Sequence, residues 1–181
     1  VTNVAGFTYN SVRWSTRFIS GGLDKILGQL TPLLGDLKTT DQREAIHAAL
    51  NGIVGDYLEA KDNPLQIKMQ VRYQAEAIPL NCKSIEAVYP SVNGKILLMV
   101  HGSCMNDIQW AQNGHNHGAA IARDLDMTPI YLHYNSCRHI SLNGRSFNEL
   151  LEGLVLSWPV PVDELVIIAH SMGGLVTRSA M

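Results

Sequence analysis

One segment near the C-terminal end most constrains what this sequence can fold into. Residues 165–180 read LVIIAHSMGGLVTRSA, which is an apolar run, a short turn and a helix-compatible stretch over 174–180. This order predicts a buried strand, a sharp turn and a helix, with Ser171 at the apex of the turn. Only small residues fit two positions before and after such an apex, and Ala169 and Gly173 meet that need. A serine held in this way is presented as a nucleophile.

The chain before this turn alternates between short apolar runs and helical patterns. Predicted strands are 67–73, 95–100, 129–134 and 165–168, with 84–88 as a candidate strand, and predicted helices are 118–125 and 146–158. Strands separated by helices of this length indicate a mostly parallel sheet with helices on both faces. We therefore expect an α/β domain over residues 65–181.

Residues 1–64 show a different pattern. A break at 35–40 separates two helical stretches, and Asp41 followed by Glu44 marks the start of the second, which Asn63-Pro64 ends. The two apolar stripes are Leu23, Ile26, Leu27, Leu30 and Leu34, then Ile46, Leu50, Ile53, Val54 and Tyr57. We expect an N-terminal helical hairpin packed on the α/β domain. The alternative is that these helices form a lid or an element that contacts a membrane, although the second stripe lacks the lysine-rich polar face of a membrane-surface helix.

Composition excludes several classes of function. The 181 residues are 46% hydrophobic and 17% charged, which is an ordinary globular balance. The formal net charge of −2 gives no electrostatic case for binding nucleic acid. No apolar run approaches the roughly 18 residues of a transmembrane segment. The N-terminus shows no signal peptide, which favours the cytoplasm over secretion.

The cysteines and the paired histidines carry little functional signal. Cys82, Cys104 and Cys137 match no zinc spacing, and an odd, sparse set favours free thiols over a Cys104–Cys137 disulfide. His115 and His117 flank a helix start, and polar residues at a helix start account for the pair as well as a metal would. We therefore assign no metal ligands and expect no cofactor.

The loop after the strand 95–100 supplies the second half of a candidate site. Acyl chemistry at Ser171 needs N–H donors for the developing oxyanion, and the backbone of Met172 is one of them. The loop reads HGSCMND over 101–107. Gly102 lets its backbone turn closely under a substrate, and the N–H of Ser103 is the natural second donor. The carboxyl ends of parallel strands would bring the two segments together.

Other polar residues near these turns receive supporting roles. We expect His101 to brace the loop by hydrogen bonding, and Asn106 and Asp107 to cap or brace it. His170 should point away from Ser171 and pack beside neighbouring strands. Three weak candidates for contacts with a substrate follow predicted strand ends, and they are Cys104, Met105 and Arg138.

Together these motifs resemble the α/β-hydrolases of the lipase and esterase type. The matching pieces are VHGS at 100–103, AHSMGG at 169–174 and the strand–helix spacing between them. GHNHGAAIARDL and YLHYNSCRHISLNGRSFNELLE resemble a bacterial subgroup related to GPI inositol-deacylases. The resemblance covers about residues 67–181, the N-terminal part of that domain, and residues before it are only loosely similar to the extensions of that subgroup.

The resemblance implies hydrolysis of a small-molecule acyl ester or a lipid through a Ser–His–Asp/Glu triad, with Ser171 as the nucleophile. The amides of Met172 and Ser103 would hold the oxyanion. Acid and histidine follow the serine in this family, so we expect both beyond Met181 and expect residues 1–181 alone to be inactive. Thioesterase, amidase and acyltransferase remain open, whereas a dehalogenase would place Asp at position 171. The alternative is a truncated, non-catalytic domain that binds a ligand or partner. The sequence indicates neither the acyl and alcohol groups nor the oligomeric state.

Overall fold

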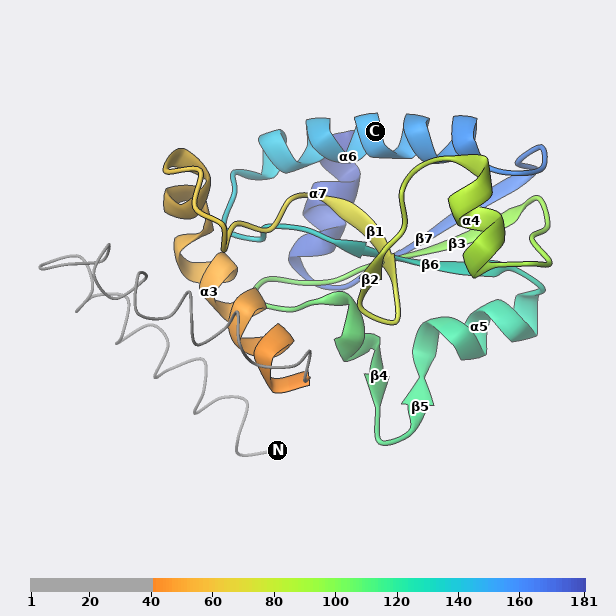
Figure 1. Ribbon diagram of the computed structural model, residues 1–181, viewed down its shortest axis with the longest axis horizontal. Coiled ribbons are helices and arrows are strands. Elements are labelled where there is room, and N and C mark those ends of the chain that lie inside the picture. The colour runs from red at the N-terminus through yellow and green to blue at the C-terminus, as the bar shows by residue number, and fades with distance from the viewer. Residues whose placement is uncertain (1–40) are drawn as a thin grey trace, which may run out of the picture.

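In a computed structural model, which describes residues 41–181, the chain forms a five-stranded sheet flanked by helices (Figure 1). The strands are β1 (Gln70–Tyr73), β2 (Glu76–Ala77), β3 (Lys95–Val100), β6 (Thr128–His133) and β7 (Glu164–Ala169), in the order β2-β1-β6-β3-β7. β3 is parallel to both β6 and β7, whereas β1 runs antiparallel to β6. The predicted α/β class is confirmed, and the sheet is mixed because β1 joins it in the opposite direction. Of the predicted hairpin, the helix around 23–34 lies outside the described residues.

The helices divide between the two faces of the sheet and its end. α4 (Cys82–Val88), α6 (Ile140–Ser157) and α7 (Met172–Ala180) lie on one face, and α5 (His117–Leu125) lies on the other (Figure 1). α3 (Asp41–Ala60) lies beyond the carboxyl ends of β3 and β6. Between β3 and α5 the chain forms the 3-10 helix η1 (Asp107–Trp110) and the hairpin of β4 (Ala111–Gln112) and β5 (His115–Asn116).

The burial of β3 explains why its sequence, KILLMV, is apolar at every position after Lys95. Ile96, Leu98 and Val100 belong to the core that contains Phe147 and Leu154 of α6. Leu97 and Met99 belong to the core on the α5 side. A strand covered on both faces needs apolar residues at every position, so it reads as a continuous hydrophobic run.

The candidate strand at 84–88 is wrong, because this segment is the end of helix α4. The Asn81 side chain accepts a hydrogen bond from the Ser84 N–H and caps the helix. Only Ile85 of the helix is fully buried, so the helix buries one narrow face. Five residues are too few to separate the strand period from the helix period. The predicted strand at 67–73 is also shorter than expected, since β1 begins only at Gln70.

Within the described residues, helix α3 spans Asp41–Ala60 and has non-helical backbone angles at Val54. Its buried side combines polar and small residues with part of the predicted apolar stripe, since Leu50, Val54 and Tyr57 are partly buried and pack against Leu58 and Leu65. The residues it buries are Glu44, Ala48, Ala49, Asn51, Gly55 and Leu58. The buried Asn51 side chain has hydrogen-bond partners for both of its polar atoms. Its amide nitrogen donates to the carbonyl of Leu65 and its amide oxygen accepts from the N–H of Ile67, each at 2.8 Å. Ile46, by contrast, is 47% exposed. α3 therefore docks through polar and small residues together with one part of its apolar stripe.

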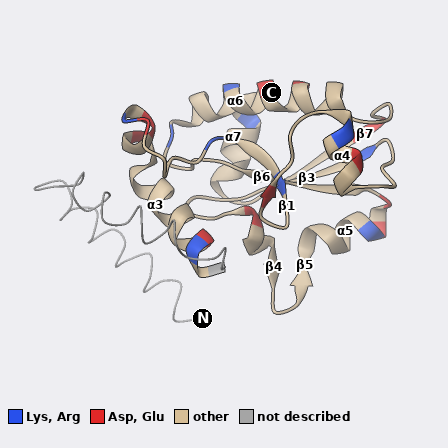
Figure 2. Cartoon of the chain, in the orientation of Figure 1, with Lys and Arg blue, Asp and Glu red and all other residues tan. Residues whose placement is uncertain are grey.

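Charges of both signs are interspersed along the described chain. Lys or Arg and Asp or Glu occur together on each of α3, α4, α5 and α6 (Figure 2). None of the helices within residues 41–181 has the length and apolar character needed to cross a membrane.

The packing of α6 on α7 gives a stability prediction. A Cβ on Gly144 of α6 would stand 2.7 Å from the Cβ and 2.8 Å from the backbone carbon of Ser179 in α7. Because the two helices must separate, Gly144→Ala should lower the free energy of unfolding by about 1–3 kcal/mol. Urea denaturation of the purified protein measures this change.

Gly153→Ala on the same helix is the matched control. A Cβ there would meet only the flexible end of Leu80, at 3.1 Å. Since alanine is favoured over glycine inside a helix by roughly 0.5–1 kcal/mol, this variant should be neutral or slightly stabilised. Equal losses in both variants would contradict close packing at Gly144.

Candidate active site

Ser171 stands at the apex of the turn between β7 and α7. Its backbone angles are φ 52° and ψ −121°, in a region that residues other than glycine rarely adopt. Such a conformation costs of order 1–3 kcal/mol and persists only where the surrounding structure holds it. The Gly173 N–H donates to the His170 carbonyl at 2.9 Å, and the Gly174 N–H donates to the Ser171 carbonyl at 3.0 Å. The turn therefore presents an exposed serine on a strained backbone.

Two glycines bring this turn against the loop that follows β3. A Cβ on Gly173 would stand 2.6 Å from the His101 carbonyl oxygen and 2.9 Å from that of Val100. A Cβ on Gly102 would stand 2.8 Å from Nδ1 of His170 and 3.2 Å from Cβ of Ser171. Segments about seventy residues apart in sequence are thus in direct contact, as the parallel pairing of β3 with β7 allows.

The backbone amides predicted to hold an oxyanion lie on these two segments. Met172 is the first residue of α7, so its N–H has no partner within the helix. Ser103 is exposed in a turn that the Met105 N–H closes onto the Gly102 carbonyl at 3.4 Å. The Cys104 N–H, by contrast, donates to Ser136 Oγ at 2.9 Å. In the part of the chain that the structure describes, the amides of Met172 and Ser103 have no acceptor.

His101 is fully buried and holds the loop after β3. Its Nδ1 donates to the Gly102 carbonyl at 2.8 Å, and its Nε2 accepts from the Tyr134 N–H at 3.3 Å. Its ring stacks on the Tyr134 ring with centroids 4.4 Å apart. One donor and one acceptor define a neutral imidazole. Burial lowers the pKa of His101 to about 4, against the opposing effect of the hydrogen bond to Gly102.

The remaining predicted residues have different surroundings. His170 is exposed, with Nδ1 close to Gly102, rather than packed beside the strands. Ala169 ends β7 opposite Val100, and Cys104 and Met105 are half-buried. Arg138 joins α3 to α6, because its Nε lies 3.1 Å from Glu59 and its Nη1 donates to Ser146 Oγ at 2.8 Å. Within residues 41–181, no side chain is hydrogen-bonded to the Ser171 hydroxyl.

A buried ion-pair network beside the loop was not predicted. Arg72 of β1 lies between Glu44 of α3 and Asp107 of η1, and His133 of β6 also approaches Asp107. Burial alone would raise the pKa of Asp107, but His133 and Arg72 hold it below its ordinary value. Glu44 had the signature of a helix start and Asp107 that of a loop brace, whereas nothing in the sequence marks Arg72.

The paired histidines at the start of α5 pack on each other. The rings of His115 and His117 lie edge to face, 4.8 Å apart, and Asn116 caps the helix by accepting from the Ala119 N–H. Among the described residues, no group of three or more His, Cys, Asp and Glu side chains is placed to hold a metal ion.

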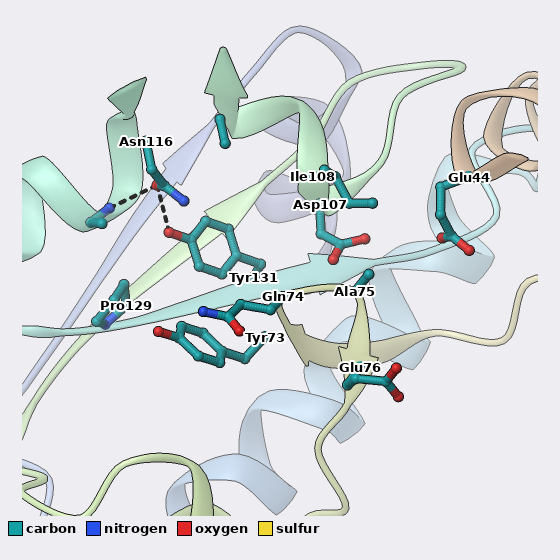
Figure 3. A pocket seen from close by; sticks show the side chains of 12 residues that line it. Glu44, Tyr73, Gln74, Ala75, Glu76, Asp107, Ile108, Asn116, Pro129 and Tyr131 are labelled. Atoms are coloured by element: carbon teal, nitrogen blue, oxygen red, sulfur yellow. Dashed lines mark hydrogen bonds between the residues drawn. The ribbon is translucent and has the colours of Figure 1, made fainter. Parts of the chain in front are cut away.

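A cavity of about 560 Å³ lies on the α5 side of the sheet (Figure 3). Tyr131 and Asn116 line one end, where the tyrosine hydroxyl donates to the amide oxygen at 2.7 Å. Asp107 and Glu44 line the other end. No residue of the Ser171 turn lines this cavity, so it is separate from the candidate nucleophile.

Comparisons with protein-family models, curated proteins and solved structures found no match. The functional argument therefore depends on the geometry of the Ser171 turn and on the motifs that it contains.

The buried neutral His101 predicts a loss of stability in acid. Its pKa of about 4 in the folded chain lies below the ordinary 6.5, so between these values the unfolded chain binds the additional proton. The contribution is complete above pH 6.5 and falls as the pH drops towards 4, by up to about 1.4 kcal/mol per pH unit. Urea unfolding at pH 7 and pH 5 measures it.

The variant His101→Asn should be less stable at pH 7 but should lose less on going to pH 5. The control His115→Asn removes an exposed histidine, so it should keep the pH dependence of the parent protein. If His101→Asn shows the same pH dependence as the parent, burial of a neutral His101 is not the cause.

Proposed function

We propose that this protein is a serine hydrolase that cleaves carboxylic ester bonds, of the lipase and esterase type of α/β-hydrolase. The observation that carries the proposal is the conformation of Ser171, an exposed serine at φ 52° between a parallel strand and a helix. Nothing in the packing of the turn requires a serine there, since its hydroxyl caps no helix N–H. Strain at an exposed nucleophilic residue is typical of a functional site.

The contact between the Ser171 turn and the loop after β3 supports acyl chemistry. Ser171 Oγ would attack the acyl carbonyl carbon while a general base takes its proton, which gives a tetrahedral oxyanion. The free amides of Met172 and Ser103 flank the serine, and the N-terminus of α7 adds partial positive charge. Collapse of the intermediate expels the alcohol, which leaves protonated, and water then hydrolyses the acyl-enzyme.

The general base is a separate part of the proposal. His101 is neutral, buried and engaged at both ring nitrogens, which makes it unsuited to the role. His170 is next to Ser171 in the chain, and its Nδ1 lies close to Gly102. The order of the triad in this family, with acid and histidine after the serine, supports a base and an orienting carboxylate from later residues.

Labelling with a fluorophosphonate tests the function directly, because this reagent reacts with serines activated for acyl transfer. The full-length protein should become labelled at Ser171, as peptide mass spectrometry detects, and should hydrolyse p-nitrophenyl esters. Ser171→Ala should abolish labelling and lower kcat by at least about 10³-fold. The exposed Ser91 provides a control, since Ser91→Ala should retain both properties.

The acyl group is then found with p-nitrophenyl esters of graded chain length. A preference for short chains supports an esterase, and a preference for long chains supports a lipase. Absence of labelling in the folded protein would reject the hydrolase and would favour the non-catalytic binding domain.

A further inference from the structure

We infer that Arg72 is a positioning residue for the loop 101–107 and that its pairing with Glu44 makes the placement of this loop depend on helix α3. The inference rests on the proposed function, since it concerns the loop that carries the Ser103 amide. It goes beyond that function because it assigns a role in the site to β1 and α3, which contain none of the residues that would contact a substrate.

The first observation is that one guanidinium joins two buried carboxylates. Arg72 Nη1 lies 2.9 Å from Glu44 Oε2 and 3.0 Å from Asp107 Oδ1. The three side chains are 7%, 10% and 2% exposed for Arg72, Glu44 and Asp107. Because water cannot replace these partners, removing the charge of one leaves the others incompletely compensated.

The backbone also fixes the guanidinium in place. Arg72 Nε and Nη2 both donate to the carbonyl of Ala75, in the turn between β1 and β2. Arg72 is also the register partner of Tyr131 on the central strand β6. Its charged group is therefore held from the sheet side by contacts that do not involve the two carboxylates.

Asp107 transmits this anchor to the loop. It lies four residues after Ser103 and begins η1, whose capping box is formed by Asn106 and Gln109. Asp107 Oδ1 also lies 3.2 Å from His133 Nδ1. The loop is thus held near its start by His101 and Gly102 and at its end by the charge of Asp107, with the Ser103 amide between the two anchors.

Helix α3 contacts this loop at a second point. A Cβ on Gly52 would stand 2.8 Å from Cα and 2.4 Å from Sγ of Cys104, the residue after Ser103. Cys104 itself has φ 58°, an uncommon conformation for this residue. Glu44, eight residues earlier on the same helix, is connected to the end of the loop because Arg72 pairs with both Glu44 and Asp107. Figure 3 shows the Glu44 and Asp107 side chains coming from different elements to the same end of the cavity.

Loosening of the loop would displace the Ser103 amide from the position where it can hold an oxyanion. A displacement of about 1 Å in a catalytic group can cost about 100-fold in rate, and loss of an oxyanion donor costs about 10²–10³-fold in kcat. A loosened loop therefore lowers kcat, whereas KM changes little because the donor matters most in the transition state.

The test compares Glu44→Gln with Glu59→Gln in the full-length protein. Both variants keep the shape of the side chain and remove one charge-paired carboxylate of α3. Glu59 pairs with Arg138 and with no residue of the loop 101–107. We expect Glu44→Gln to lower kcat about 10–100-fold with KM within about twofold, and Glu59→Gln to change neither constant by more than about twofold. Equal effects of the two variants would overturn the inference, since they would reflect general loosening of α3.

Hydrogen exchange of peptides covering 101–107 is measured on the same samples and needs no activity. Faster exchange there in Glu44→Gln, but not in Glu59→Gln, supports the positioning role, and unchanged exchange overturns it. If the parent protein neither turns over esters nor reacts at Ser171, the proposed function fails. The exchange result then still decides whether the pairing of Glu44 with Arg72 positions the loop.

Discussion

The contact between the end of β3 and the Ser171 turn is the constraint on which the rest of the structure depends. It exists because Gly102 and Gly173 have no Cβ, so the backbones of two segments approach to distances that a side chain would forbid. The parallel pairing of β3 with β7 then sets the two segments at the same height of the sheet. The strained conformation of Ser171 is held by this contact and by the first turn of α7, and the candidate site is a product of backbone proximity.

Several buried polar side chains near this contact have their partners within the protein. His101 uses both ring nitrogens and stacks on Tyr134, whose hydroxyl donates to the His101 carbonyl at 2.9 Å. Arg72 satisfies two buried carboxylates. Buried polar groups of this kind are costly unless every partner is present, so they define one arrangement of the loop rather than a range of them. α3 is part of that arrangement, because it contributes a carboxylate and a close glycine contact.

The main strands could be predicted because each contains at least four apolar residues in a row, and for β3 and β6 these residues are mostly buried. β3, β6 and β7 contain the apolar runs 96–100, 129–132 and 165–169, and α5 and α7 come where the helical pattern resumes. β7 stands last in the strand order of the described chain and is half-buried, rather than buried as predicted. α6 begins at Ile140, six residues before the predicted start, because its first turns carry polar and small residues instead of the apolar stripe. Among these, Asn143 is buried and donates to the Asn135 carbonyl at 2.9 Å. β2, β4 and β5 have two residues each, too few for any periodicity to appear.

The sequence by itself determined the strand–turn–helix order around Ser171, the small residues of the turn and the loop that should face it, because these features depend on neighbours in the chain. Tertiary structure alone decided which side of α3 is buried, and that side includes Glu44 and Asn51 beside part of the apolar stripe. It also decided that Arg72, Glu44 and Asp107 meet, although Arg72 is 28 and 35 residues from its two partners. The physical reason is that pairing between buried charges depends on which segments the sheet brings together. A local sequence pattern does not indicate which segments these are.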